Sequence, residues 1–545
     1  MSDYHPPVQN IMFLLHDVLG FSHEELDRET VEAVLDEAAK LASGILAPLN
    51  KSGDEQGASL NGQDVKTAQG FKEAYKQYCE GGWNAVPFDP EYGGQGLPWA
   101  IAFPVQEMWQ GANMSFGLCP LLNQGAVEAI SAHGTDEQKD YFLPKLITGE
   151  WTGTMNLTES QAGSDLGLLN ARAERQDNGT YKITGQKIFI TYGEHDMAEN
   201  IIHLVLARLP GAPDDVRGIS LFIAPKILED GTRNSLSCIG LEHKLGIHAS
   251  PTCTMDFDSA TGYLLGKEHE GLKCMFTMMN NARLSVGLQG VAIAEHALQH
   301  AQNYAAERIQ GKSFETGQRV TIKQHPDIRR TLLSMRSYVE AGRALTYEAA
   351  LALDAAAQGD TCAKAKADLL TPIVKSWCTD MAVEVASLGL QVHGGMGFIE
   401  ETGAAQYYRD ARILPIYEGT NGIQAQDLVF RKVLHDQGEA ASSYIKNMQG
   451  AVEEDILDTL SKTTSDLLKK GNDKDMEALA WAASPYLKAL GIIAGGAWLE
   501  KIAKTAKNNS ALEKAFQQEK QDNATFYRHN ILPLAAAHLK SVYNS

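Results

Sequence analysis

The chain has 545 residues, of which 44% are hydrophobic and 21% charged, and its formal net charge is −20. This length favours several domains over a single core, and the negative charge disfavours a protein that binds DNA or RNA by neutralising phosphates. The seven cysteines include no C-x-x-C pair, which argues against a zinc ribbon or a disulfide framework and favours reduced thiols.

Membrane insertion and secretion find no support in the sequence. The longest apolar stretch, residues 489–499, is too short to span a bilayer, and its small residues favour a tightly packed helix. The N-terminal residues M-S-D-Y-H-P-P lack the basic region and apolar run of a signal peptide. We therefore expect a cytoplasmic protein with no integral membrane segment.

The first predicted region is helical. Apolar residues in 29–42 recur at helical spacing and would form one buried face, which consists of Val31, Val34, Leu35, Ala38 and Leu41. Gly- and Pro-rich loops at 81–83 and 91–98 separate later helices. We assign residues 1–153 to an N-terminal α-helical domain.

Strands dominate the second region, residues 154–270. The turn sequence Asp177-Asn178-Gly179 predicts a hairpin between strands at 171–175 and 181–184. A second predicted turn, Gly185-Gln186, precedes a strand at 187–191. Short strands follow at 200–207, 218–224 and 252–257. This even spacing without helices predicts an antiparallel β-barrel or sandwich.

Helical periodicity returns in 271–434 and continues in 435–545, after a change of composition near Leu434. This change of composition, which includes a stretch rich in Lys, Asp, Ser and Thr at 462–475, is interpreted as a boundary before a helical C-terminal extension. The predicted fold class is therefore α+β and multidomain, with an N-terminal helical domain, a middle β domain, a C-terminal helical bundle and the extension.

Several common site motifs are absent from the chain. No G-x-G-x-x-G opens a strand-turn-helix unit, and no P-loop, G-x-S-x-G elbow or H-E-x-x-H helix occurs. His243 and His248 have no clustered acids or cysteines beside them. We therefore predict no metal site.

Two segments combine polar groups with glycines. The stretch T-M-N-L-T-E-S-Q-A-G-S-D-L at 154–166 can donate hydrogen bonds to a polar ring edge or to phosphates, or it is an ordinary Ser/Gly loop. The stretch Q-V-H-G-G-M-G-F at 391–398 lets a ligand or another subunit approach the main chain. The alternative is a helix C-cap with a sharp turn.

A single acid stands in R-I-L-P-I-Y-E-G-T-N-G-I-Q at 412–424. Glu418 follows an apolar, strand-like run and precedes a glycine-containing turn. Partial desolvation there would raise its pKa and make it a usable base. The alternative is a solvated turn acid.

Taken in this order, the segments resemble the acyl-CoA dehydrogenase family. The resemblance rests on four motifs, M-N-L-T-E-S-Q-A-G-S-D-L, K-I-F-I-T-Y-G, Q-V-H-G-G-M-G-F and I-Y-E-G-T-N-G-I-Q, and covers about 77–434. It implies that the middle domain (154–270) binds flavin and substrate and that a C-terminal four-helix bundle (271–434) carries the catalytic base. The N-terminal segment and the extension resemble the branch that acts on 3-(methylthio)propanoyl-CoA.

This resemblance implies an FAD-dependent α,β-dehydrogenation of an acyl-CoA thioester to a trans-2-enoyl-CoA. Glu418 matches the base that removes the α-proton, while flavin N5 takes the β-hydrogen as hydride. We expect a short acyl chain, with 3-(methylthio)propanoyl-CoA as a candidate, and electron-transfer flavoprotein as the electron acceptor. Because neighbouring chains complete the flavin site in this family, a homo-oligomer, dimer or tetramer, is implied.

Site residues of the family carry over position by position. The positions that match substrate contacts are Ser164, Arg283, Tyr417 and Gly419. Those that match FAD contacts are Met155, Asn156, Leu157, Thr158, Gly163, Ser164, Phe189, Ile190, Thr191, Arg308, Gln391, Gly394, Gly395, Thr420 and Gln424. Phe189 stands where tryptophan is usual, which keeps an aromatic wall but loses an indole donor.

Two other functions stay open at this point. One is an acyl-CoA oxidase, which reduces O2 and would form hydrogen peroxide in aerobic turnover. The other is a catalytically quiet flavoprotein of the same fold that binds nucleic acid. The net charge and the intact Glu418 both disfavour the second, so no nucleic-acid partner is expected.

Overall fold

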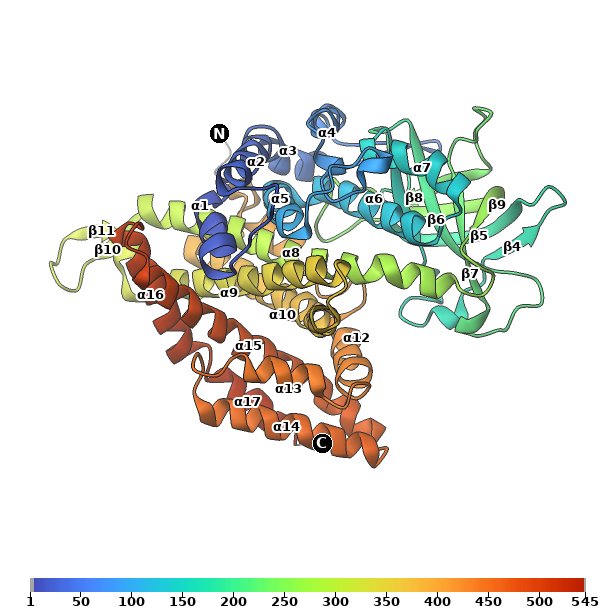
Figure 1. Ribbon diagram of the computed structural model, residues 1–545. Helices are drawn as coiled ribbons and strands as arrows, with labels where there is room; N and C mark the ends of the chain where they lie inside the picture. Colours follow the sequence, from blue (N-terminus) through green and yellow to red (C-terminus); the bar gives the residue numbers. More distant parts are fainter. Residues whose placement is uncertain (1–3, 544–545) are drawn as a thin grey trace. The chain divides into compact units, whose positions relative to one another are not determined.

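The computed structural model describes residues 4–543, apart from the side chains of Met278 and Asn280. The chain forms two compact units (Figure 1). The first unit consists of Met1–Ser43, Trp99–Ala112 and Arg283–Ser545, and the second of Gly44–Pro98 and Asn113–Ala282. The division of the sequence into four domains stays a prediction.

The first unit is almost entirely helical. It contains the C-terminal part of α8 (Gly271–Glu307), which begins in the second unit. Its other helices are α1 (Val8–Met12), α2 (Arg28–Leu41), α5 (Trp99–Ala112), α9 (Pro326–Ala357), α10 (Thr361–His393), α11 (Ala404–Ala411), α12 (Asn421–Gln426), α13 (Glu439–Lys446), α14 (Glu454–Asn472), α15 (Met476–Asn508), α16 (Lys514–Asn530) and α17 (Leu534–Ser541). A small hairpin joins β10 (Ile309–Lys312) to β11 (Arg319–Thr321).

Helix α2 confirms the helical prediction near the N-terminus. The Asp27 side chain accepts a hydrogen bond from the Thr30 backbone N–H at 2.8 Å and thereby caps the helix. On the predicted apolar face, Val31, Leu35 and Ala38 are buried, whereas Val34 and Leu41 are half-buried.

Small residues allow α8, α9 and α10 to approach one another closely. A Cβ on Gly287 of α8 would lie 2.5 Å from Cγ1 of Val374, and a Cβ on Gly342 of α9 would lie 2.8 Å from Cε of Met381. Both partner side chains belong to α10. Larger residues at these glycines would push the helices apart, and the spacing of the bundle sets where residues of α8 and α10 meet.

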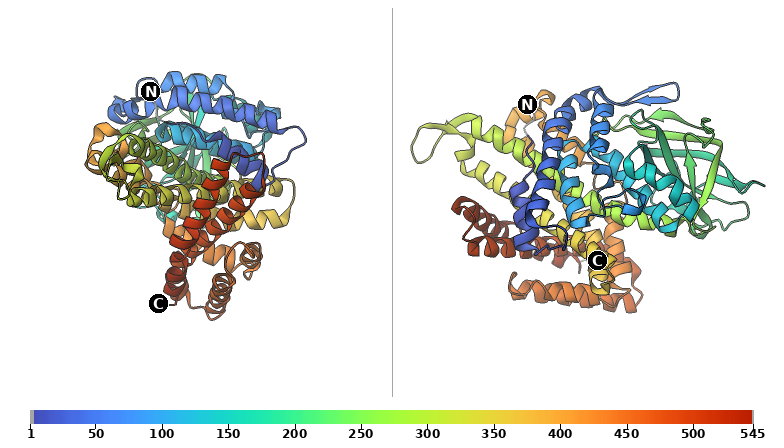
Figure 2. Two further views of the ribbon diagram at one scale, coloured as in Figure 1. Left: turned by 90° about the vertical axis from the view of Figure 1, so that its left-hand side faces the viewer. Right: turned by 45° about the horizontal axis from the view of Figure 1, so that its top comes forward.

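The C-terminal extension packs against this bundle, as the views of the orange and red helices show (Figure 2). A Cβ on Gly491 of α15 would lie 2.6 Å from Cγ of Trp377, which confirms the tight packing predicted for 489–499. Most of the polar stretch 462–475 lies in α14, where Thr463, Thr464 and Leu467 are buried and Lys462, Ser465 and Lys469 are exposed.

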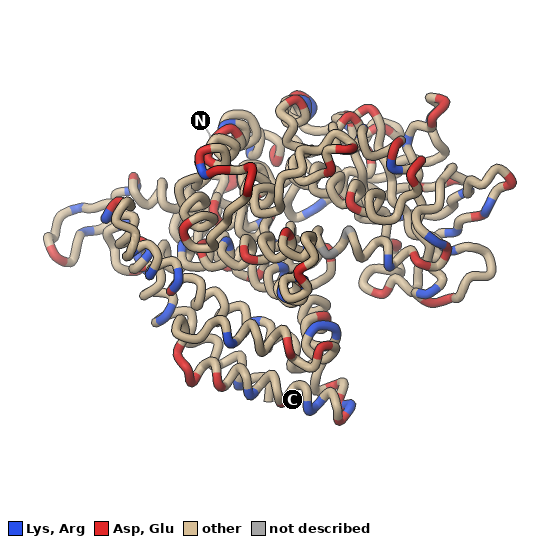
Figure 3. Tube along the Cα trace, in the orientation of Figure 1, with Lys and Arg blue, Asp and Glu red and all other residues tan. Residues whose placement is uncertain are grey.

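One helix among the described residues, α15, is long and apolar enough to cross a membrane by length and composition alone. In this structure 72% of its most apolar window is buried by the rest of the chain. Figure 3 shows acidic and basic residues interspersed along the other helices of the extension.

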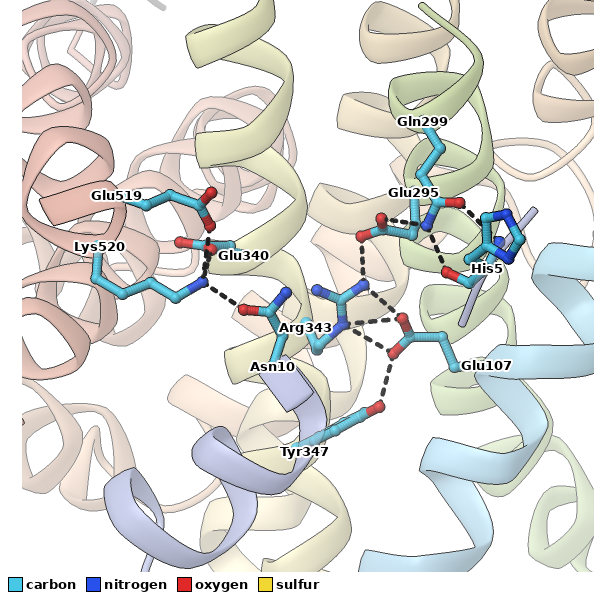
Figure 4. A network of polar contacts seen from close by, with 10 residues as sticks. All are labelled: His5, Asn10, Glu107, Glu295, Gln299, Glu340, Arg343, Tyr347, Glu519 and Lys520. Atoms are coloured by element: carbon cyan, nitrogen blue, oxygen red, sulfur yellow. Dashed lines mark hydrogen bonds and ion pairs between the residues drawn. The ribbon is translucent and has the colours of Figure 1, made fainter. Parts of the chain in front are cut away.

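A buried polar network joins α5, α8 and α9 (Figure 4). The Arg343 guanidinium contacts Glu107 Oε1 at 2.6 Å and Glu295 Oε2 at 2.7 Å. The Tyr347 hydroxyl donates to Glu107 Oε2 at 2.7 Å. These groups are buried, so each charge depends on its partners for stabilisation. A neighbouring group, centred on Lys520 of α16, links the extension to α9 through an ion pair with Glu340.

The second unit combines helices with a β-domain. Its helices are α3 (Pro48–Gln56), α4 (Phe71–Glu80), α6 (Met114–His133), α7 (Asp136–Thr148) and the start of α8. Its seven-stranded sheet contains β3 (Trp151–Asn156), β4 (Arg172–Arg175), β5 (Tyr181–Thr191), β6 (Asn200–Arg208), β7 (Ile219–Pro225), β8 (Leu236–Leu241) and β9 (Thr252–Leu265). A hairpin of β1 (Ser59–Asn61) and β2 (Asp64–Lys66) interrupts the region predicted to be wholly helical.

The strand pairing agrees with the predicted barrel. Strands β6, β4, β5, β9 and β7 pair in a closed ring, since β7 pairs with both β9 and β6. Most pairs are antiparallel, but β6 pairs in parallel with both β3 and β4. Side chains of Ile183, Val205, Phe222 and Met255 belong to the buried core of this β-domain.

One local prediction in the β-domain is wrong. The predicted turn at Gly185-Gln186 lies inside the continuous strand β5, where the pairing with β9 shifts register between Ile183 and Gly185. Gly185 has φ = 145° and its Cβ position lies 2.9 Å from Ala171. The glycine therefore serves a bulge in the strand instead of a chain reversal.

Candidate active site

Glu418 lies in a tight turn of the first unit, between α11 and α12. Glu418 has φ = 53° and Gly419 has φ = 86°, so two consecutive residues adopt a conformation that residues with a Cβ rarely adopt. A Cβ on Gly419 would lie 2.7 Å from Nε2 of Gln424. The run before Glu418 is not strand-like. It forms successive turns, in which Tyr417 N donates to Ile413 O at 3.2 Å.

The start of α12 holds this turn in place. Thr420 is the N-cap of α12, and its hydroxyl accepts from Ile423 N at 3.3 Å. Gln424 is fully buried, and its Nε2 lies 3.5 Å from Glu418 O and 3.4 Å from Gly419 O. Its Oε1 has no hydrogen-bond partner among the described residues. Thr420 and Gln424 therefore shape the turn, and Gln424 keeps one acceptor unused.

The Glu418 carboxylate is partly buried and lacks a direct partner. Within residues 4–543 it forms no hydrogen bond and no ion pair. Burial raises the pKa of Glu418, while the nearby positive charges of Arg283 and Lys375 act to lower it. A raised pKa lets a carboxylate hold an abstracted proton closer to neutral pH.

Arg283 enters this region from α8. It is 4% exposed, and its Nη1 pairs with Asp427 Oδ2 at 3.3 Å. Arg431 contacts the other oxygen of Asp427 at 3.7 Å. The Arg283 Nε has no hydrogen-bond partner in the described part of the chain. Arg283 thus has a structural ion pair, and its predicted contact with the acyl-CoA stays a prediction.

The Tyr417 hydroxyl is already engaged within the bundle. It donates to Gln289 Oε1 at 2.5 Å, and Gln289 Nε2 donates to Gln110 Oε1 at 3.1 Å. This chain connects the turn to α8 and α5. A substrate contact by Tyr417 would therefore use its ring or main chain.

In the second unit, the predicted flavin positions form two adjacent segments. Ile188 N donates to Thr158 O at 2.9 Å, and the Thr154 hydroxyl donates to Thr191 O at 2.7 Å. The structure therefore brings the stretch 155–158 beside 189–191, although the two are separated by a hairpin in sequence. Phe189 is 58% exposed and has φ = 61°.

Burial separates these positions into two kinds. Met155, Asn156 and Ile190 are buried, so they can reach a ligand through their main chain. Leu157, Thr158 and Thr191 are half-buried, whereas Gly163 and Ser164 are exposed. A Cβ on Gly163 would meet no atom within 4 Å, which leaves open space beside that main chain.

A buried ion pair that the sequence analysis missed shapes this loop. Lys187 Nζ contacts Glu159 Oε1 at 2.8 Å, and both side chains are buried. Glu159 also accepts hydrogen bonds from the backbone N–H groups of Asn170 and Ala171. Glu159 lies in the motif M-N-L-T-E-S-Q-A-G-S-D-L and Lys187 in the motif K-I-F-I-T-Y-G. Only the folded structure shows that the two residues pair.

The remaining predicted flavin positions lie at the surface of the first unit. Arg308 follows α8 and is exposed, and it forms no ion pair with the described residues. Gln391 lies in the last turn of α10, and Gly394 and Gly395 follow that helix. All three are exposed, and a Cβ on either glycine would meet nothing within 4 Å.

Four family descriptions match nearly the whole chain. The N-terminal domain of acyl-CoA dehydrogenases matches 28–150, the middle domain 154–260 and the C-terminal domain 269–432. A further description, acetyl-CoA dehydrogenase C-terminal like, matches 433–545. The chain belongs to the acyl-CoA dehydrogenase family.

The similarity to individual acyl-CoA dehydrogenases supports the same family assignment. The chain is 51% identical to 3-methylmercaptopropionyl-CoA dehydrogenase of Ruegeria pomeroyi, over 81% of this chain and 78% of that protein. It is 35% identical to the broad-specificity linear acyl-CoA dehydrogenase of Mycobacterium tuberculosis, over 90% of this chain and 85% of that protein. The solved butyryl-CoA dehydrogenase of Megasphaera elsdenii is 28% identical with a TM-score of 0.64 and covers 75% of this chain and 99% of its own.

Acyl-CoA dehydrogenases are flavoproteins that bind FAD, and the residues of this chain fit that cofactor. Phe189 offers an exposed aromatic face beside the half-buried hydroxyls of Thr158 and Thr191, which suits a flat ring with polar edges. The open main chain at Gly394 suits a pyrophosphate, and so does the Arg308 guanidinium, which forms no ion pair within the described part of the chain.

Proposed function

We propose that this acyl-CoA dehydrogenase acts on a short-chain thioester, 3-(methylthio)propanoyl-CoA, and that Glu418 is its catalytic base. The 51% identity to the R. pomeroyi enzyme supports the substrate. The base assignment rests on one observation, a partly buried carboxylate with a raised pKa and no partner among the described residues.

The Glu418 carboxylate removes the proton from the α-carbon of the thioester. Within the described residues, the backbone N–H of Glu418 donates no hydrogen bond. It is therefore available to the thioester carbonyl, where a donor makes the α-proton more acidic. Bound FAD supplies the acceptor for the β-hydrogen, which leaves as hydride. Gly419, which has no side chain, lets the main chain approach the substrate.

The other sequence assignments belong to the same proposal. Ser164, Arg283, Tyr417 and Gly419 would contact the acyl-CoA. The residues that match the family's FAD contacts would hold FAD, with Arg308, Gln391, Gly394 and Gly395 serving a neighbouring copy in a homo-oligomer. Electron-transfer flavoprotein would receive the electrons, and the enzyme would work in the cytoplasm.

An anaerobic titration with a panel of acyl-CoA thioesters tests the substrate. The panel contains the 3-(methylthio)propanoyl, butanoyl, octanoyl and palmitoyl thioesters, and bleaching of the oxidised flavin is the signal. We expect the methylthio thioester to give the largest rate constant of bleaching divided by its dissociation constant. A larger value for octanoyl- or palmitoyl-CoA would contradict the short-chain assignment.

A second measurement separates a dehydrogenase from an oxidase. Aerobic turnover should form hydrogen peroxide far more slowly than an artificial electron acceptor is reduced. Equal rates of the two processes would favour an acyl-CoA oxidase.

A further inference from the structure

A buried lysine lies beside the turn that carries Glu418. Lys375 of α10 is fully buried, with no exposed surface. Its Nζ donates one hydrogen bond, to Asn421 Oδ1 at 2.9 Å. It forms no ion pair within 4 Å in the described part of the chain. An ammonium group with one neutral partner in a protein interior is costly, so its presence calls for a physical reason.

The partner of Lys375 belongs to the turn itself. Asn421 is the first residue of α12 and follows Glu418 by three positions, and its backbone N–H donates to Pro415 O at 3.0 Å. The Asn421 side-chain Nδ2 donates to Asp380 Oδ1 at 2.7 Å and to Ser376 O at 3.1 Å. Through this amide, α10 holds the turn on the side of Lys375.

The charged groups around Lys375 come from four elements. Asp380 lies on α10 and pairs with Lys488 of α15 at 3.3 Å. Arg283 of α8 pairs with Asp427 of the π-helix Asp427–Val433. Glu418 is the remaining carboxylate. The carboxylates of Asp380 and Asp427 thus have cations of their own, whereas Glu418 has none in contact.

We propose that Lys375 is a positioning residue for the dehydrogenation, which holds the Glu418 turn through Asn421 and keeps Glu418 ionised in the resting enzyme by its buried positive charge. The proposal rests on the proposed function, in which Glu418 is the base. A base must be ionised before it can accept the α-proton, and burial alone works against that.

The electrostatic balance agrees with this geometry. Burial lowers the pKa of Lys375 to about 7, while Glu418 and Asp380 act to raise it. In return, Lys375 and Arg283 lower the pKa of Glu418, which burial raises. Removal of the Lys375 charge should therefore raise the pKa of Glu418 further, and the base should become protonated at a higher pH.

The pH profile of kcat/KM in three variants tests the proposal, with the fastest thioester of the panel as substrate. Lys375→Gln keeps a donor for Asn421 and removes the charge. We expect the acidic limb of its profile to move to higher pH by about one unit, the size of a shift typical for one nearby charge. At a pH below both limbs its rate should fall roughly tenfold relative to wild type, and above both limbs it should approach wild type.

Two further variants give the comparison. Lys375→Arg keeps the positive charge and should return the acidic limb to near its wild-type position. Lys364→Met, on an exposed lysine of the same helix that pairs with Asp368 at 3.4 Å, should leave the profile unchanged. A folded, FAD-loaded Lys375→Gln enzyme with the wild-type acidic limb would overturn the proposal.

A measurement on the wild-type holoenzyme covers the case in which variants of Lys375 do not fold. The infrared difference spectrum between wild type and Glu418→Gln reports the ionisation of Glu418. We expect a carboxylate band at about pH 6, where Lys375, with a pKa of about 7, carries its charge, and a protonated carboxyl band there would also overturn the proposal.

Failure of this inference is distinguishable from failure of the proposed function. If Glu418→Gln turns over like wild type, the base is elsewhere and the proposed function fails. If Glu418→Gln is inactive but Lys375→Gln keeps the wild-type limb, only the role of Lys375 fails.

Discussion

The first unit contains two buried groups of charges that are built in opposite ways. Around Arg343, both carboxylates have direct partners, with Arg343–Glu107 at 2.6 Å and Arg343–Glu295 at 2.7 Å. Although burial acts to raise it, the pKa of Glu295 lies below its ordinary value because of Arg343. Glu418 has cations nearby but none in contact, and its pKa is raised. A fully paired carboxylate holds helices together, whereas an unpaired one can change its protonation.

Another carboxylate, in the second unit, is intermediate between the paired carboxylates and Glu418. Glu128 of α6 is partly buried and accepts from Gln124 Nε2 at 3.0 Å, while its Oε2 has no partner among the described residues. Burial raises the pKa of Glu128 to about 8. Amide partners alone therefore do not keep a buried carboxyl ionised at neutral pH.

The largest expected effect separates Glu418 from the paired carboxylates. Glu418→Gln should lower kcat by roughly 10²–10⁴, the usual contribution of a positioned base, because the amide cannot accept the α-proton. The variant should keep its FAD content and melting temperature, since Glu418 forms no ion pair with the described residues that the substitution could remove. Stopped-flow reduction of the flavin measures the rate, flavin absorbance measures the FAD content, and a thermal scan gives the melting temperature. Turnover near that of wild type would refute the assignment.

Arg343→Met should show the opposite pattern to Glu418→Gln, because its main effect should be a loss of stability. Removal of one partner from a buried ion group costs about 3–5 kcal/mol, since Glu107 and Glu295 would be left without their cation. Urea denaturation of the holoenzyme measures this change.

A control for Arg343→Met is Arg336→Met, because Arg336 forms a half-exposed pair with Glu519 at 2.8 Å. Its cost should be below about 1 kcal/mol. If both variants lower the free energy of unfolding by the same amount, burial would not make the Arg343 ion group more important for stability than an exposed pair. Addition of Glu107→Gln and Glu295→Gln to Arg343→Met should recover part of the loss.

Glu128→Gln should give the smallest effect, and one that depends on pH. The folded-state pKa of Glu128 is raised from 4.5 to about 8, so the folded state binds more protons in this interval and wild-type stability falls as the pH rises through it. The amide does not titrate. The variant should match wild type near pH 4.5 and exceed it above pH 8, by about 1 kcal/mol or more.

Urea midpoints at the two pH values check this prediction. Glu37→Gln, at an exposed residue that pairs with Lys40, is the control and should change the urea midpoint less than Glu128→Gln does above pH 8. A Glu128→Gln midpoint that tracks wild type across this range would mean that Glu128 is ionised in the folded protein.

Much of the fold was predictable because its signals are local. The repeat of Val31, Leu35 and Ala38 identifies α2, and the turn sequence at 177–179 identifies the β4–β5 hairpin. The predictions of a strand-like run before Glu418 and of a turn at Gly185-Gln186 were wrong for a shared reason. Apolar or polar composition over a few residues does not tell whether the backbone bonds within itself or with a distant segment.

The sequence by itself determined the family and the candidate base. Both depend on short contiguous motifs, in which residue type and spacing carry the chemistry. Only the tertiary structure decided which charges are paired. Lys375 meets Asn421 across 46 positions and Arg343 meets Glu107 across 236, so the same residue types become a tuning charge or a structural pair according to which helices the packing brings together.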